Sequence, residues 1–261
     1  MIRNRKPRRI ITPAKNISRR KTRIEKTYTK KKKSKKVTIS TKVNIKKSPR
    51  VDLKRKPMNY SAVKPIFNGE TVYIVGGGPS LNNFDWNKLK NRNTIVINKA
   101  FYNLPTSQVM YWTDSRFYTW YKTDIDKFKG LKYTIRRSNY DENVMLLKKG
   151  PKHGLSILKD TLAHGNNSGY AAINLAYLLG AKKIILLGFD MGNNTNGKSH
   201  FHDGYPTKAT SNEVYQKQFI PGFDSLWAAL KEKGINVYNA CPTSNLKVFP
   251  FISIERALAL R

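Results

Sequence analysis

Short apolar runs alternate with polar, glycine-containing stretches along most of the chain. Six of these runs have the length and the β-branched or aromatic composition of buried strands. They are Thr71–Val75, Asn93–Ile97 and residues 108–113, 131–135, 183–189 and 235–238. The run at residues 183–189 (KIILLGF) is the most apolar. We expect it to be a central strand, because strands buried on both faces form continuous apolar runs.

Stretches with helical spacing of apolar residues lie between these runs. They are residues 81–90, 115–128, 165–180, 214–233 and 251–260. Asn167 or Ser168 is a good N-cap for the helix over 165–180, and Gly180 is a good stop signal. Pro221 should kink or split the helix over 214–233.

The alternation of strands and helices predicts an α/β fold with a Rossmann-like, doubly wound and mostly parallel sheet. We expect this domain, with nucleotide binding as its function, to span residues 68–261. Residues 139–164 are polar at both ends and punctuated by glycine, so we expect a loop or a small lid insertion there.

Positive charge is concentrated at the N-terminus. The formal net charge is +34, and residues 1–57 hold 24 of the 50 Lys and Arg residues but two of the 16 acidic ones. One cluster (KKKKSKK) contains Lys30, Lys31, Lys32, Lys33, Lys35 and Lys36. Residues 1–60 are predicted to be a disordered basic arm that binds nucleic acid or another polyanion by counterion release. The alternative is a solubilising tail without a partner.

Cysteine usage and hydropathy narrow the protein class. The single cysteine, Cys241, excludes an internal disulfide framework and fits a reducing compartment. No apolar run approaches the ~20 residues of a membrane span. We therefore expect a cytoplasmic protein with no transmembrane segment, in the host cytoplasm if the protein is viral, with virion association left open.

Residues 71–80 (TVYIVGGGPS) are typical of a strand, a tight turn and a helix start. Glycine permits close backbone approach, and proline suits the first turn of a helix. Bare N–H groups in such a turn, next to the positive end of a helix dipole, form an anion site. Gly76, Gly77, Gly78 and Ser80 are therefore candidate phosphate or nucleotide ligands. The alternative is a tight turn that binds nothing.

Polar residues also follow the other predicted strands, at the sheet edge where ligands of open α/β folds bind. They are Asn98, Asp114, Asp190 and Asn239. Asn98 can contact a base or ribose edge. Asp114 or Asp190 can hold a ribose hydroxyl or a divalent ion, with N-capping as the alternative role. Ser168 and Gly169 place a second helix N-terminus at the same edge.

Two histidines lie on a polar loop after the most apolar strand, in the sequence HFHD. A zinc site built from His200, His202 and Asp203 is disfavoured, because only His153 and His164 remain as further histidines. His200 is a better candidate for a general base, since histidine can take a proton from an attacking hydroxyl near neutral pH. The alternative is an exposed polar loop.

The order of these motifs resembles a nucleotide-binding fold that two families share. The motifs are GGGPS, INKA, WTD, GNNSGYAAINLAYLLGAKKIILLGFDM, SHFH and VYNACPTSNLKVFP, within about residues 70–255. One family is the bacterial sialyltransferases of glycosyltransferase family 42. The other contains the archaeal 6-hydroxymethylpterin diphosphokinase. Phage proteins carry similar motif orders.

The sialyltransferase resemblance implies a transferase that uses a nucleotide or nucleotide-sugar donor. In that family a GNGPS turn and a following asparagine contact the CMP part of the donor, and they correspond to residues 76–80 and Asn98 here. A Thr-Ser-Gly helix start corresponds to residues 167–169, and His200 is nearest to the family's catalytic histidine. Gly77 replaces the asparagine of GNGPS, and the loop before His200 is much shorter than in those enzymes.

The diphosphokinase resemblance implies a Mg²⁺- and ATP-using transferase, with Asp114 and Asp190 as candidate ion ligands. The short spacing between GFDM and the histidine is closer to this group. A third interpretation comes from a different class: a non-catalytic nucleic-acid-binding or virion-associated protein that acts through its basic arm. Metal dependence separates the two transferase interpretations, and deletion of the arm separates both from the third.

Overall fold

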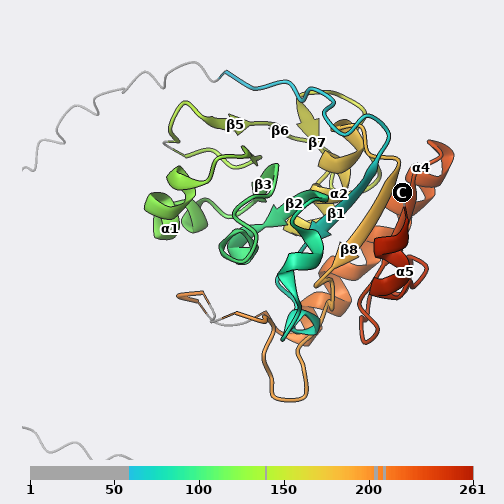
Figure 1. Cartoon of the computed structure of the whole chain (residues 1–261). Coiled ribbons are helices and arrows are strands. Elements are labelled where there is room, and N and C mark those ends of the chain that lie inside the picture. Colours follow the sequence, from blue (N-terminus) through green and yellow to red (C-terminus); the bar gives the residue numbers. More distant parts are fainter. Residues whose placement is uncertain (1–58, 139, 203–204, 208–209, 261) are drawn as a thin grey trace, which may run out of the picture. The chain divides into compact units, whose positions relative to one another are not determined.

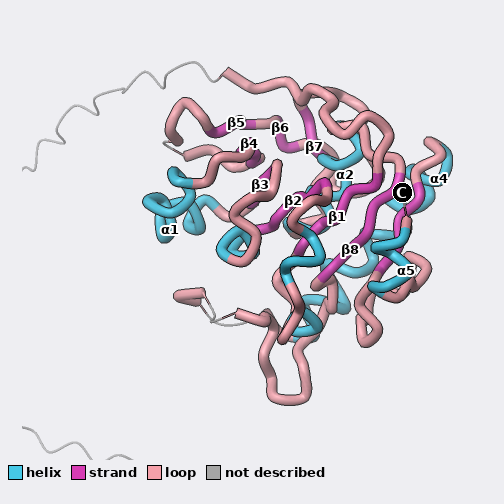
Figure 2. Tube along the Cα trace, viewed as in Figure 1, coloured by secondary structure: helices cyan, strands magenta, loops and turns pink. Residues whose placement is uncertain are grey.

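A seven-stranded parallel sheet forms the centre of the part of the chain that the structure describes (Figures 1 and 2). The computed structural model describes residues 59–138, 140–202, 205–207 and 210–260. The strand order is β5-β4-β3-β2-β1-β8-β9, and every neighbouring pair is parallel. The strands are β1 Thr71–Val75, β2 Asn93–Ile97, β3 Val109–Trp112, β4 Leu131–Thr134, β5 Val144–Leu146, β8 Lys183–Leu187 and β9 Asn236–Asn239. The predicted sheet is confirmed.

Helices lie between most of the strands. The α-helices are α1 Ser115–Lys127, α2 Ser168–Leu178, α3 Asn212–Val214, α4 Phe223–Glu232 and α5 Ile254–Ala259. The 3₁₀ turns are η1 Pro79–Leu81, η2 Trp86–Leu89, η3 Asn98–Tyr102 and η5 Ile220–Gly222, and η4 Tyr215–Phe219 is a π-helical turn. The helix predicted over 214–233 is split near Pro221, as expected. The helix predicted over 81–90 is wrong, because Asp85 caps a short 3₁₀ turn there instead.

Alternate side chains of the strands enter two separate cores, one on each face of the sheet. On one face, Val72 and Ile74 of β1 pack with residues of α2 and α4. On the other face, Tyr73 and Val75 pack with residues of α1 and α5. The Tyr73 hydroxyl also donates a hydrogen bond of 2.8 Å to the carbonyl of Ala257 in α5. Helices therefore cover both faces, which confirms the doubly wound arrangement.

Two expectations about the arrangement need correction. The strand β8 is interior but lies next to the edge strand β9 rather than at the centre, because β2 to β5 all extend on the other side of β1. The segment 139–164, expected to be a loop or lid, contributes the edge strand β5 and the pair β6 Lys148–Lys149 and β7 Thr161–Leu162. These strands have two or three residues each, which is too few for an alternation of apolar and polar residues to be recognised in the sequence. The predicted basic arm lies outside the described residues, apart from its last two positions.

The ends of β1 and β8 meet at the topological switch point of the sheet. A Cβ atom at Gly76 would lie 2.7 Å from the carbonyl oxygen of Gly188, and one at Gly78 would lie 2.6 Å from the same oxygen. Gly188 itself has a φ of +68°. The glycines therefore let two backbone bends touch, which side chains would prevent.

We expect Gly78→Ala to destabilise the fold by at least about 2 kcal/mol, because the added methyl group has no room. The backbone of Gly78 is ordinary for any residue (φ −67°), so the effect is one of space. Its Cβ would lie 1.9 Å from Oδ2 of Asp190 as well as against the β8 bend. The free energy of unfolding from urea titrations measures the loss.

Gly77→Ala is the matched control in the same bend. Its Cβ would meet only the Nδ1 of His200 at 3.1 Å and the Nε2 of His202 at 3.4 Å, the far ends of side chains. A much smaller loss is expected there. Equal losses at the two positions would contradict the close approach of the two bends.

Candidate functional site

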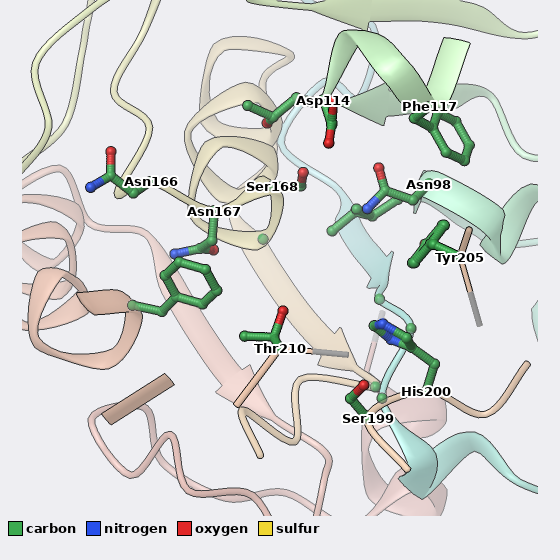
Figure 3. A pocket seen from close by; sticks show the side chains of 18 of the residues that line it. Asn98, Asp114, Phe117, Asn166, Asn167, Ser168, Ser199, His200, Tyr205 and Thr210 are labelled. Carbon is green, nitrogen blue, oxygen red and sulfur yellow. The ribbon is translucent and has the colours of Figure 1, made fainter. Parts of the chain in front are cut away.

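A cleft of about 1300 Å³ opens at the carboxyl ends of the strands, at the switch point between β1 and β8. Nearly all the predicted site residues line it (Figure 3). They are Gly76, Gly77, Gly78, Asn98, Asp114, Ser168, Gly169, Asp190 and His200. Ser80 does not line the cleft, and it contacts Asp190 instead. Asn239 also lies outside, buried, with its amide nitrogen donating to the carbonyl of Leu246.

The backbone amides of the glycine bend are bonded within the protein. Gly76 and Gly78 donate to carbonyl oxygens at the end of β8, at 2.8 and 2.9 Å. The amide and the hydroxyl of Ser80 both donate to the carboxylate of Asp190, at 2.8 and 2.7 Å. The expectation of bare N–H groups is therefore wrong at these three positions. The amides are occupied because carbonyl oxygens at the end of β8 and the carboxylate of Asp190 lie against the bend after β1 and accept their hydrogen bonds.

The two candidate acidic ligands both have structural partners. Asp190 is 6% exposed, and burial raises the pKa of its carboxyl while the hydrogen bonds from Ser80 oppose the rise. Asp114 caps α1 and forms a salt bridge of 2.6 Å with Arg116, whose hydrogen bond lowers the pKa of Asp114. Across the described residues, no group of three or more His, Cys, Asp or Glu side chains is placed to hold a metal ion.

The first turn of α2 presents unbonded amides to the cleft. Asn167, one of the two predicted candidates, is the N-cap, and its side chain accepts a hydrogen bond of 2.8 Å from the amide of Tyr170. The described part of the chain offers no acceptor to the amides of Ser168 and Gly169. Both residues line the cleft (Figure 3). The positive end of the helix dipole and two N–H donors therefore remain for an anion.

The histidine loop folds back onto the glycine bend. The amide of Phe201 donates a hydrogen bond of 2.9 Å to the carbonyl of Gly77. The rings of His200 and His202 stack beside this bond, with centroids 4.9 Å apart and planes 11° apart. A side chain at position 77 would meet these rings. Gly77, which has no side chain, thus makes room for the two histidines.

Burial keeps His200 uncharged at neutral pH. Its pKa is lowered to about 4, first by burial and then by the nearby charges of His202 and Lys99, while a hydrogen bond with the Gly77 backbone opposes the shift. The ring of Tyr205 packs edge-on against both imidazole rings, and its centroid lies 5.2 Å from that of His200 and 5.3 Å from that of His202. Burial also raises the pKa of Tyr205, against a hydrogen bond with the side chain of Asn98. His200 is a neutral proton acceptor in this setting.

Left-handed backbone conformations concentrate at the cleft. Of the five described non-glycine residues with a positive φ, Asn98 (+51°), Asn166 (+58°) and Met191 (+51°) line it. Such conformations cost energy and cluster at binding sites.

Several cleft residues were missed by the sequence analysis. Tyr205, Trp120 and Lys149 line the cleft but belong to no motif. The signal that could have pointed to Tyr205 was its position three residues after His202, on the same loop.

Comparisons with known proteins support the fold. No protein-family model and no curated protein matches the chain. Among solved structures, it is similar to a Maf glycosyltransferase from Magnetospirillum magneticum AMB-1, with 17% identity, a TM-score of 0.51, and coverage of 77% of this chain and 36% of that one. Sialyltransferases from Campylobacter jejuni are further neighbours. CstII, solved with CMP, has 19% identity and a TM-score of 0.45, and the match covers 70% of this chain and 85% of CstII. Cst-I has 19% identity and a TM-score of 0.41, and the match covers 75% of this chain and 84% of Cst-I.

The chain therefore has a glycosyltransferase-like fold, and it spans about a third of the length of the Maf enzyme. Sialyltransferases are among its structural neighbours, whereas the relations to the diphosphokinase family and to phage proteins stay predictions. None of the described helices combines the length and the apolarity needed to cross a membrane.

We expect the free energy of unfolding to fall as the pH is lowered from about 6.5 to about 4. The pKa values of His164 and His200 are both lowered from 6.5 to about 4, mainly by burial. In this window the unfolded chain binds more protons than the folded one, so acid favours unfolding. Asp190, whose pKa is raised, acts in the opposite direction. Urea titrations across this pH range measure the slope.

Replacing His164 and His200 together with asparagine should flatten this slope, whatever the change does to stability at pH 7. A slope that is the same in the variant and in the original chain would show that these two side chains are not held neutral.

Proposed function

We propose that the protein is a glycosyltransferase-like enzyme that transfers a group from a nucleotide donor. One observation carries the proposal: the cleft at the switch point brings the open amides of α2 and the neutral His200 to the same cavity. Open α/β sheets bind nucleotides at this place. The fold shared with a solved glycosyltransferase and the motif order both support the same class.

The donor's phosphate binds at the first turn of α2. The amides of Ser168 and Gly169 supply hydrogen bonds, and the helix dipole supplies positive potential. Asn98 lies across the cleft, between Ser168 and Tyr205 in Figure 3, where its side chain contacts the ribose or the base. The glycine bend does not hold the phosphate through the amides of Gly76 or Gly78. Its role is to anchor the histidine loop through the carbonyl of Gly77.

His200 acts as the general base. Its neutral ring accepts the proton of an acceptor hydroxyl while that oxygen forms a bond to the transferred carbon. The bond from this carbon to the phosphate oxygen breaks, and the nucleotide leaves with the electron pair. An anionic donor raises the pKa of the ring, because negative charge favours the protonated form. Binding of the donor therefore strengthens the base when it is needed.

The two other interpretations rest on Asp114, Asp190 and residues 1–57. In a Mg²⁺-dependent diphosphokinase reaction, the ion would share Asp114 with Arg116, or Asp190 with Ser80. Nucleic-acid binding through residues 1–57 concerns a segment outside the described residues and stays a prediction.

A thermal-shift panel of the full chain with CMP, UDP, GDP, ATP and a CMP-sugar, each in Mg²⁺ and in EDTA, tests the proposal. We expect one nucleotide to stabilise the fold by about 2.7 kcal/mol at 100 times its dissociation constant, equally in both media. Stabilisation by ATP in Mg²⁺ alone would favour the diphosphokinase reaction. No stabilisation by any nucleotide would refute the proposal.

His200→Asn separates binding from catalysis in the same assay. The variant should keep the stabilisation by the nucleotide and lose turnover by a factor of about 10² to 10⁴. His153→Asn is the control, because His153 is exposed and does not line the cleft. Full turnover by His200→Asn would remove the residue from the mechanism.

A further inference from the structure

A smaller cavity of about 260 Å³ adjoins the cleft. The small cavity is a side chamber of the cleft, because the two share the lining residues Thr113, Ile135, Arg136, Lys149, Asn166 and Phe219. It lies beside the end of β4, the β6–β7 pair and the segment before α2. The segment 139–164, expected to be a loop or lid, thus contributes Lys149 to the lining of the chamber.

The side chamber is lined by positive charge without negative charge. Arg136 and Lys149 line it, and none of its described lining residues is acidic. In the described part of the chain, neither cation forms a salt bridge. The positive charge of Arg136 lowers the pKa of Asp114, but this carboxylate is already paired with Arg116. Uncompensated cations at a cavity favour an anionic ligand.

His164 adds a hydrogen-bond donor to the same chamber. Its side chain is 6% exposed and lines the chamber. Its Nδ1 accepts a hydrogen bond of 3.0 Å from the amide of Asn166, so the proton of the neutral ring is on Nε2. The described residues provide no acceptor for this Nε2–H. This N–H is therefore open to the chamber, where a ligand can accept its hydrogen bond.

The surroundings of His164 agree with an anion site. Its pKa is lowered to about 4 by burial first, and then by the positive charges of Lys149, Arg136 and Lys152 and by His153. No carboxylate is among these influences. The ring stays neutral mainly because it is buried, and the nearby positive charges add to this effect, so it can donate one hydrogen bond without adding a further charge.

We propose that the side chamber binds a phosphoryl group carried by the acceptor, held by Arg136, Lys149 and the Nε2–H of His164. The guanidinium and ammonium groups provide charge-assisted hydrogen bonds, and the imidazole provides the neutral one. The acceptor is then a phosphorylated molecule whose hydroxyl reaches the main cleft. The identity of the molecule that carries the phosphate rests on the proposed transferase function, whereas binding of phosphate in the chamber does not.

Proton NMR of the four histidines of the full chain, titrated with inorganic phosphate at constant ionic strength, tests the proposal. His164→Asn identifies the His164 resonances. We expect phosphate to move these resonances, and Lys149→Gln to weaken the binding about tenfold, which is the loss of one charge-assisted contact. The local signal separates the chamber from phosphate bound elsewhere on this basic chain.

Lys148→Gln is the matched control. Lys148 is the neighbour of Lys149 in β6, and its substitution removes the same charge. Its side chain forms a salt bridge of 2.6 Å with Asp160 and does not line the chamber. Its binding of phosphate should equal that of the original chain. Equal weakening in both variants, or His164 resonances that phosphate does not move, would overturn the proposal.

A second titration distinguishes an acceptor phosphate from a phosphate of the donor. In the presence of saturating CMP, inorganic phosphate should still move the His164 resonances, because the nucleotide phosphate lies at α2. Displacement of phosphate by CMP would overturn the assignment to the acceptor. Absence of CMP binding with phosphate binding intact would refute the proposed donor and leave the chamber's phosphate site standing.

Discussion

Contact between two backbone bends constrains the whole site. The bend after β1 and the bend after β8 meet at Gly78 and Gly188 with no room for a side chain, and the carboxylate of Asp190 fastens them by accepting two hydrogen bonds from Ser80. This junction closes the switch point of the sheet. It also uses the amides that a glycine-rich turn would otherwise offer to a phosphate. We therefore propose that the anion site belongs to the first turn of α2.

The same junction determines the chemistry on the other side of the cleft. Because Gly77 has no side chain, its carbonyl can anchor Phe201, and the rings of His200 and His202 fill the space beside it. Burial there keeps His200 neutral. In the proposed mechanism, the cleft separates two functions, with anion binding at one helix end and proton acceptance on a loop held by the bend. The positive side chamber extends the cleft where, in our proposal, the second substrate binds.

Much of the fold follows from local pattern. The bounds of β1 and β2 and the N-cap at Asn167 were predicted, because apolar periods and capping residues act within a few positions. The gathering of the candidate residues in one cleft followed from the parallel sheet. The use of the bend's amides could not be predicted, because Asp190 reaches Ser80 across 110 residues. The chamber at His164 was equally hidden, since its partners come from separate strands.

Amide ¹⁵N resonances of the full chain, recorded with and without CMP, test most directly where the anion binds. We expect the resonances of Ser168 and Gly169 to move strongly as their N–H groups gain an acceptor. The resonances of Gly76 and Gly78 should move little, because those amides keep their bonds to the β8 bend. Large shifts at Gly76 and Gly78 with none at Ser168 and Gly169 would contradict this assignment of the phosphate.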